Sequence, residues 1–127
     1  MLSPKVRIEE DRGIRVLSAR GEFVGGKETD LLRETLASEA EAGTSRLLID
    51  LENVQYLNST ALGVLIAAHT NFSRRGGVLA LCNVSEGINN IFVITKLSKV
   101  FSVHTDRDEA VRELAAAAAA GDDTTTE

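Results

Sequence analysis

The residue types and spacing that could support chemistry occur together in one short segment. Asn58, Ser59 and Thr60 follow an apolar run at 47–51 and precede a segment with apolar residues at helical spacing. A hydroxyl pair on the first turn of a helix, just after a strand, is well placed to hold or carry a phosphate. Two hypotheses follow: Ser59 accepts a phosphoryl group, or Asn58 or Ser59 simply caps the helix.

Other reactive side chains give weaker signals. His69 lies on the apolar side of the same helical segment, which favours a structural histidine over a catalytic base. Asp50 ends a buried strand segment, where it either caps a turn or contacts the segment around Ser59. Cys82 lies in an apolar run and predicts a buried, unreactive thiol. Because GxSxG, GxGxxG and Walker motifs are absent from the sequence, we predict no catalytic residue and no enzyme.

Composition and charge exclude several classes of function. The net charge is −5 and no basic run is present, so we expect no nucleic-acid binding. Two distant histidines and one cysteine show no metal-ligand spacing, so we predict no metal centre and no cofactor. No apolar run approaches the ~20 residues of a membrane span, and the N-terminus has no secretory pattern. With a single cysteine, these features predict a cytoplasmic protein without membrane contact.

The elements that must position Ser59 begin with an N-terminal hairpin. Residues 6–10 and 14–19 alternate apolar and polar side chains, as half-buried strands do, and residues 11–13 supply the turn. We expect Gly21 to end the second strand, and residues 23–24 to form a short further strand before a glycine pair.

Helices and buried strands then alternate along the chain. A helix is predicted from Lys27 to a stop at Gly43, and Thr29 is interpreted as a helix-start residue rather than a second site. The later predicted elements are a strand at 47–51, a polar turn, a helix from 58 to 75, a strand at 78–82, a helix at 85–97, a strand at 100–103 and a helix at 106–120. We predict one domain over 1–120 and a disordered tail at 121–127.

This order of elements predicts an α/β fold. The central sheet should be mixed, with four to five strands, four helices and the N-terminal β-hairpin. In such sheets ligands bind at the carboxyl ends of strands, which is where the segment around Ser59 falls.

The sequence from 47 to 65, LLIDLENVQYLNSTALGVL, resembles the STAS domain, the family of anti-sigma factor antagonists. Bacterial antagonists typically show a strand followed by Asp-Ser-Ser/Thr-Gly-Leu-Gly at the start of a helix. Supporting matches lie at 21–23 and 76–82, and the resemblance covers about 6–114. It implies the same fold, with Ser59 as the phosphorylatable serine and Thr60 as second choice.

In that family, the unphosphorylated protein binds a serine-kinase anti-sigma factor and so frees the sigma factor. Phosphorylation by this kinase breaks the complex, and a phosphatase restores it. The resemblance therefore implies these two partners for this chain. It also implies a partner-binding surface made of two segments: Glu22, Phe23, Val24, Gly25, Gly26 and Lys27, and Asn58, Ser59, Thr60 and Ala61.

Three residues depart from the family's pattern. Asn58 and Val24 stand where the family usually or often has aspartate, and Ala61 replaces the usual glycine. The two absent carboxylates favour an alternative function, that of a non-phosphorylated STAS scaffold or partner subunit of the stressosome type or associated with a transport complex. A homodimer and a larger STAS assembly are both compatible with the sequence.

Overall fold

A five-stranded mixed sheet forms the centre of the computed structural model, which describes residues 5–97 and 100–125. The strands are ordered along the sheet as β1 (Val6–Asp11), β2 (Ile14–Phe23), β3 (Arg46–Leu57), β4 (Val78–Cys82) and β5 (Ser102–His104). β1 pairs with β2 in an antiparallel hairpin, and the remaining neighbours are parallel. The predicted mixed sheet with an N-terminal hairpin is confirmed.

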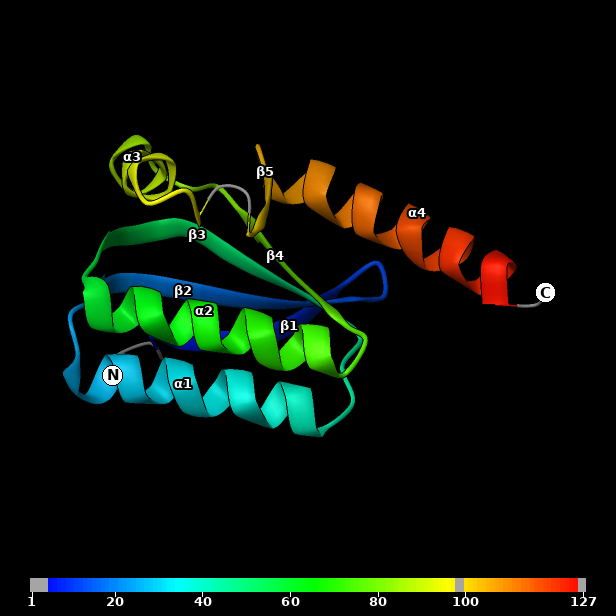
Figure 1. The fold of residues 1–127 in the computed structure, drawn as a ribbon, viewed down its shortest axis with the longest axis horizontal. Helices are drawn as coiled ribbons and strands as arrows, with labels where there is room; N and C mark the ends of the chain where they lie inside the picture. The colour runs from blue at the N-terminus through cyan, green and yellow to red at the C-terminus, as the bar shows by residue number, and fades with distance from the viewer. Residues whose placement is uncertain (1–4, 98–99, 126–127) are drawn as a thin grey trace.

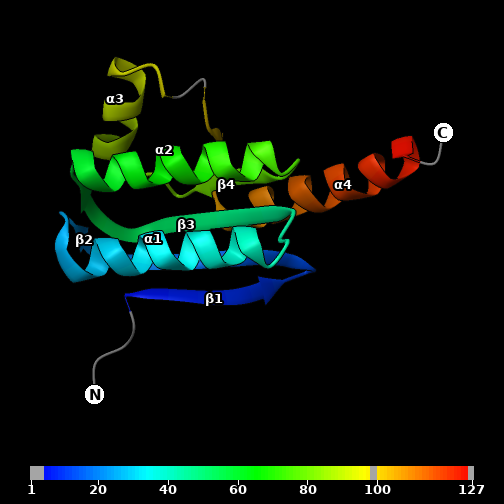
Figure 2. The ribbon, with the colours of Figure 1, turned by 60° about the horizontal axis from the view of Figure 1, so that its bottom comes forward.

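Helices cover both faces of this sheet. The helices of the described residues are α1 (Gly26–Glu41), α2 (Ser59–Arg74), α3 (Glu86–Ile94) and α4 (Arg107–Thr125). α1 and α2 lie side by side along one face, as Figures 1 and 2 show, and α4 packs on the other face. The predicted number of four helices is confirmed. Within the described ranges, no helix is both long and apolar enough to cross a membrane.

Two apolar cores result from these two covered faces. Leu47 and Ile49 of β3 pack toward α1 and α2, whereas Leu48 between them packs toward α4. All three side chains are fully buried, which explains why this part of β3 is continuously apolar rather than alternating. Each such side chain contributes roughly 1.5–3 kcal/mol by its burial. The strand that leads to Ser59 is therefore anchored from both sides.

The strands β2 and β3 are longer than predicted. The expectation that Gly21 ends the second strand is wrong, because β2 continues to Phe23 and includes the short strand expected there. The expected polar turn after Leu51 is also wrong, because β3 continues to Leu57. The pairing of β2 with β3 shifts register between Ser18 and Arg20 and again after Gly21. Such irregularities interrupt the two-residue alternation by which a strand is recognised.

Several boundaries also differ from the predictions. α3 ends at Ile94 rather than at 97, and β5 begins at Ser102 rather than at 100. α4 continues to Thr125, and so its backbone enters the segment predicted to be disordered. Residues 126–127 of that predicted tail lie outside the described residues.

Candidate functional site

The two segments of the predicted partner surface lie next to each other. The N–H of Asn58 donates a hydrogen bond to the C=O of Phe23 over 3.0 Å, and Phe23 pairs with Leu57 in the sheet. The carboxyl ends of β2 and β3 are thus joined where α1 and α2 begin (Figure 1). Residues 22–27 and 58–61 form one surface at this edge, which we call the helix-start surface.

Asn58 is the N-cap of α2. Its side-chain oxygen accepts a hydrogen bond from the N–H of Ala61 over 3.0 Å, and its C=O accepts one from the N–H of Leu62 over 2.9 Å. Ser59 is the first residue inside the helix. Of the two cap candidates, Asn58 therefore makes the cap, and the Ser59 hydroxyl is not needed for it.

The hydroxyls of Ser59 and Thr60 are available to a partner. Both residues are exposed, and within the described chain neither hydroxyl makes a hydrogen bond. Ala61 and Phe23, by contrast, are fully buried. Phe23 and Ala61 belong to the predicted partner surface by sequence, but their side chains lie beneath it. The exposed part of the helix-start surface presents the hydroxyl pair.

The helix dipole is uncompensated at Ser59. The first turn of α2 contains no acidic residue, whereas the first turn of α1 contains Glu28. The first N–H groups of any helix lack partners in the helix, and Asn58 satisfies only that of Ala61. The start of α2 therefore favours a negative group more than the start of α1 does.

Glycine conformations fix the loop before α1. Gly25 and Gly26 have φ values of 92° and 76°, which other residues rarely adopt. The N–H of Gly25 donates to the Thr29 hydroxyl over 2.8 Å, and Thr29 is fully buried. Thr29 is therefore a helix-start residue, as the sequence indicated. The loop leaves Val24 52% exposed and Lys27 exposed next to the start of α2.

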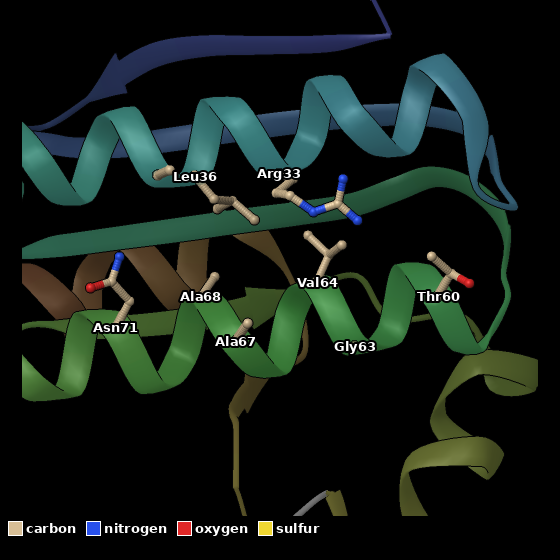
Figure 3. Close-up of a pocket in the computed structure, with 9 residues that line it drawn as sticks. Arg33, Leu36, Thr60, Gly63, Val64, Ala67, Ala68 and Asn71 are labelled. Atoms are coloured by element: carbon tan, nitrogen blue, oxygen red, sulfur yellow. The ribbon is translucent and has the colours of Figure 1, made fainter.

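A groove between α1 and α2 continues the helix-start surface. It has a volume of about 260 Å³, and its lining includes Thr60, Gly63 and Val64 of α2 and Arg33 of α1. Figure 3 shows the Arg33 side chain extending over the space between the helices toward Thr60. The groove is not predictable from a local motif, because it arises only when two helices distant in sequence pack together. Gly63 was its one local signal, a glycine inside a helix.

Asp50 and Cys82 lie away from this surface. Asp50 accepts hydrogen bonds from the N–H of Glu52 and the side-chain amide of Asn83, both over 3.0 Å. Asp50 therefore fills neither of its two predicted roles. Glu52 lies within β3 rather than in a turn, and the hydrogen bond from Asn83 connects Asp50 to the residue after β4, not to the segment around Ser59. Cys82 is fully buried, and burial raises the pKa of its thiol to about 12. Its thiol is therefore unreactive at neutral pH, as predicted.

His69 lies too far along α2 to act on Ser59. Ten residues of helix, at 1.5 Å each, separate the two by about 15 Å. The imidazole packs edge-on against Phe101 with ring centroids 5.4 Å apart, and its buried Nδ1 has no hydrogen-bond partner in the described residues. His69 and Ser59 therefore form no nucleophile–base pair.

Comparisons with known proteins find similar sequences and similar folds. The family model described as STAS domain matches residues 5–110. An anti-sigma-B factor antagonist of Bacillus subtilis (strain 168) is 35% identical over 82 residues, which are 65% of this chain and 74% of the relative. A solved anti-sigma-factor antagonist (STAS) domain protein from Planctomyces limnophilus superposes with a TM-score of 0.75 at 22% identity, covering 87% of this chain and 97% of the other.

A further solved structure is the Bacillus cell fate determinant SpoIIAA in its phosphorylated form. It superposes with a TM-score of 0.69 at 17% identity, and the match covers 86% of this chain and 98% of that one. At this identity, the likeness shows a shared fold.

Proposed function

Because this chain belongs to the STAS domain family, we propose that it is an anti-sigma factor antagonist. It binds a serine-kinase anti-sigma factor through the helix-start surface, phosphorylation of Ser59 by that kinase breaks the complex, and a phosphatase restores it. The name of the 35% identical relative, an anti-sigma-B factor antagonist, supports the proposal. In this function the chain is a cytoplasmic binding module without catalytic residues.

One observation carries the choice of Ser59. The side chain is exposed at the first position of α2, and the adjacent Asn58 makes the cap. A phosphoryl group on Ser59 would therefore replace no structural hydrogen bond. It would also meet the positive end of the α2 dipole, where a negative charge typically contributes 0.3–1 kcal/mol. We expect the phosphorylated chain to keep its fold.

The switch would act through the surface rather than through the fold. A phosphoserine adds about two negative charges at neutral pH. The helix-start surface is neutral immediately around Ser59, since Asn58 and Thr60 are neutral and Val24 is apolar. Its two exposed charged residues, Glu22 and Lys27, have opposite signs. A partner that packs on this neutral patch would have to desolvate the phosphate, and the complex would dissociate.

Two residues favour a second candidate function, that of a non-phosphorylated scaffold of the stressosome or transport-complex type. Val24 is apolar and 52% exposed, and Asn58 is neutral at the cap, so the site lacks the two carboxylates usual around the family's serine. Light scattering on the purified chain separates the two candidates. A large homo-assembly is expected of a scaffold, and a monomer or dimer of the antagonist.

Mapping the modified residue tests the proposed switch. The full chain is incubated with ATP and serine-kinase anti-sigma factors from its own organism, and the product is digested and analysed by mass spectrometry. We expect one phosphate on Ser59, which disappears in Ser59→Ala and remains in Thr60→Val. The exposed Ser38 of α1 serves as a control, because Ser38→Ala should leave the phosphorylation unchanged.

A second variant tests the surface independently of the phosphate. Gly63 is exposed, and a Cβ added there would meet no atom within 4 Å, so Gly63→Gln introduces a side chain next to Thr60 whose first atom has room. We expect this variant to fold and to bind the anti-sigma factor at least about tenfold more weakly, a loss of about 1.4 kcal/mol. Unchanged binding of Gly63→Gln, together with no phosphate on Ser59 or Thr60, would exclude the helix-start surface and the Ser59 switch. Absence of binding between the unmodified chain and every anti-sigma factor tested would exclude the antagonist function.

A further inference from the structure

Three potential metal ligands meet where β5 leads into α4, on a part of the molecule that the proposed function does not use. His104 is the last residue of β5, and Glu109 and Glu113 lie one helical turn apart near the start of α4. One ligand atom from each residue lies within 4.8 Å of the other two. His104 Nδ1 and the Glu113 carboxylate are 2.7 Å apart. α4 packs on the sheet face opposite α1 and α2.

No arginine or lysine of the described residues forms an ion pair with the two glutamates of this cluster, and of the two His104 contacts only Glu113. Arg107 pairs with two carboxylates of β1, and Arg112 pairs with Asp108. The carboxylate of Glu109 makes no hydrogen bond within the described part of the chain. The two carboxylates repel each other, and a cation bound between them and His104 would relieve that repulsion.

We propose that His104, Glu109 and Glu113 bind a divalent transition-metal ion of the Zn²⁺ class. Imidazole nitrogen with carboxylate oxygen is a ligand set that suits zinc, whereas magnesium and calcium prefer oxygen alone. A tetrahedral ion about 2.1 Å from each ligand atom holds these atoms about 3.4 Å apart. Small rotations of the glutamate side chains bring the cluster to that spacing, because Glu113 is exposed and Glu109 is partly exposed.

The position of the cluster gives the ion a structural consequence. β5 has only three residues and lies at the edge of the sheet. A metal held by His104 from β5 and by two residues from α4 would tie this short strand to the helix. The three protein ligands leave a fourth position for water or for a group from a partner. Metal binding should therefore raise the melting temperature of the chain.

Titration of Zn²⁺ into the metal-free full chain by isothermal calorimetry tests this site. We expect one equivalent to bind with a dissociation constant in the micromolar range. His104→Gln, Glu109→Gln and Glu113→Gln should each weaken binding by about tenfold or more. Glu86→Gln is the matched control, because Glu86 is an exposed glutamate in the first turn of α3, and it should bind as the unmodified chain does.

Two further measurements distinguish specific binding at this site from adventitious binding. With Co²⁺ in place of Zn²⁺, the near-ultraviolet spectrum should lack a thiolate charge-transfer band, which excludes Cys82 as a ligand. Zn²⁺ should raise the melting temperature of the unmodified chain but not that of His104→Gln, with circular dichroism confirming that the variants fold. The proposed site would be refuted if the unmodified chain did not bind Zn²⁺ at millimolar concentration. It would also be refuted if all three glutamine variants bound Zn²⁺ as tightly as the unmodified chain.

Discussion

Asn58 and Ser59 are adjacent, but the structure separates their roles at the start of α2. The Asn58 side chain caps the helix through the N–H of Ala61, and the Ser59 hydroxyl is exposed without a hydrogen bond in the described residues. Asparagine accepts this bond as aspartate does, because the cap needs only an oxygen. Replacing the family's aspartate by Asn58 therefore removes a charge but keeps the helix start.

The first prediction separates these two roles by stability. Asn58→Ala should lower the free energy of unfolding by about 1 kcal/mol, because an N–H of α2 loses its cap. Asn58→Asp should keep that free energy, since a carboxylate also caps and suits the helix dipole. Ser59→Ala should change it by less than about 0.5 kcal/mol. Urea unfolding followed by circular dichroism measures all three, and an equal loss in Ser59→Ala and Asn58→Ala would show that the serine is structural.

The sequence placed Asn58, Ser59 and Thr60 together at the start of one helix but left their roles there open. Ser59, Thr60 and Asn58 were singled out by type and position, and the structure brings them together with residues 22–27. Sequence could not decide between Asn58 and Ser59 as the cap, since both residue types are preferred there. That choice depends on where the backbone turns from extended to helical, which the structure places at Asn58.

At the scale of elements, an ion pair joins the strand and helix that support the helix-start surface. Arg15 near the start of β2 donates two hydrogen bonds to Glu39 near the end of α1, over 3.0 and 2.8 Å, and Thr44 donates a third. The Glu39 side chain is only 9% exposed. The hydrogen bonds from Arg15 hold the pKa of Glu39 below its ordinary value of 4.5.

The second prediction follows from this lowered pKa. Because the folded pKa lies below the unfolded one, the contribution of Glu39 to stability is fully present above about pH 4.5 and is lost as the pH falls through the folded value. Glu39→Gln should lower the free energy of unfolding by about 2 kcal/mol at pH 7 and by less at pH 3.5. Urea unfolding at both pH values gives the two differences.

Glu41 provides the matched control for this measurement. It is exposed at the end of the same helix, so Glu41→Gln should change the free energy of unfolding little at either pH. Comparing the free energies of unfolding of Glu39→Gln and Glu41→Gln at each pH cancels the effect of other carboxylates with lowered pKa values, such as Glu9 and Asp11. If Glu39→Gln lowered the free energy of unfolding equally at pH 7 and at pH 3.5, the proposed role of the Glu39 charge would be contradicted.

The elements with a regular pattern were predictable, and the irregular ones were not. Helical spacing identified α1 and α2, and the apolar run of β4 was placed at its observed residues. The sequence predicts a turn in the second half of β3. The buried residues there, Leu51, Val54 and Leu57, are three apart, whereas a regular strand buries every second residue. Two register shifts against β2 produce this spacing, and they depend on a neighbouring strand rather than on local sequence.

At the scale of the molecule, the two sheet faces have different neighbours. One face carries α1 and α2, whose starts form the helix-start surface together with the groove between them. The other carries α4, whose first turn is held by Arg107 against β1. A switch on the first face leaves the second free, so the proposed metal cluster near α4 and the proposed partner surface are structurally independent. The order of elements predicts the mixed sheet but not which helix covers which face, and Gly63 inside α2 is the one local signal of the groove.

The affinity of the anti-sigma factor for the chain before and after phosphorylation tests the account most directly. The measurement is isothermal calorimetry with the unmodified chain, the chain phosphorylated at Ser59, and the same sample after phosphatase treatment. We expect phosphorylation to weaken binding by at least about tenfold, or about 1.4 kcal/mol, and the phosphatase to restore it, with circular dichroism unchanged throughout. Equal affinity of the phosphorylated and unmodified chains would contradict the assignment of Ser59 as the switch.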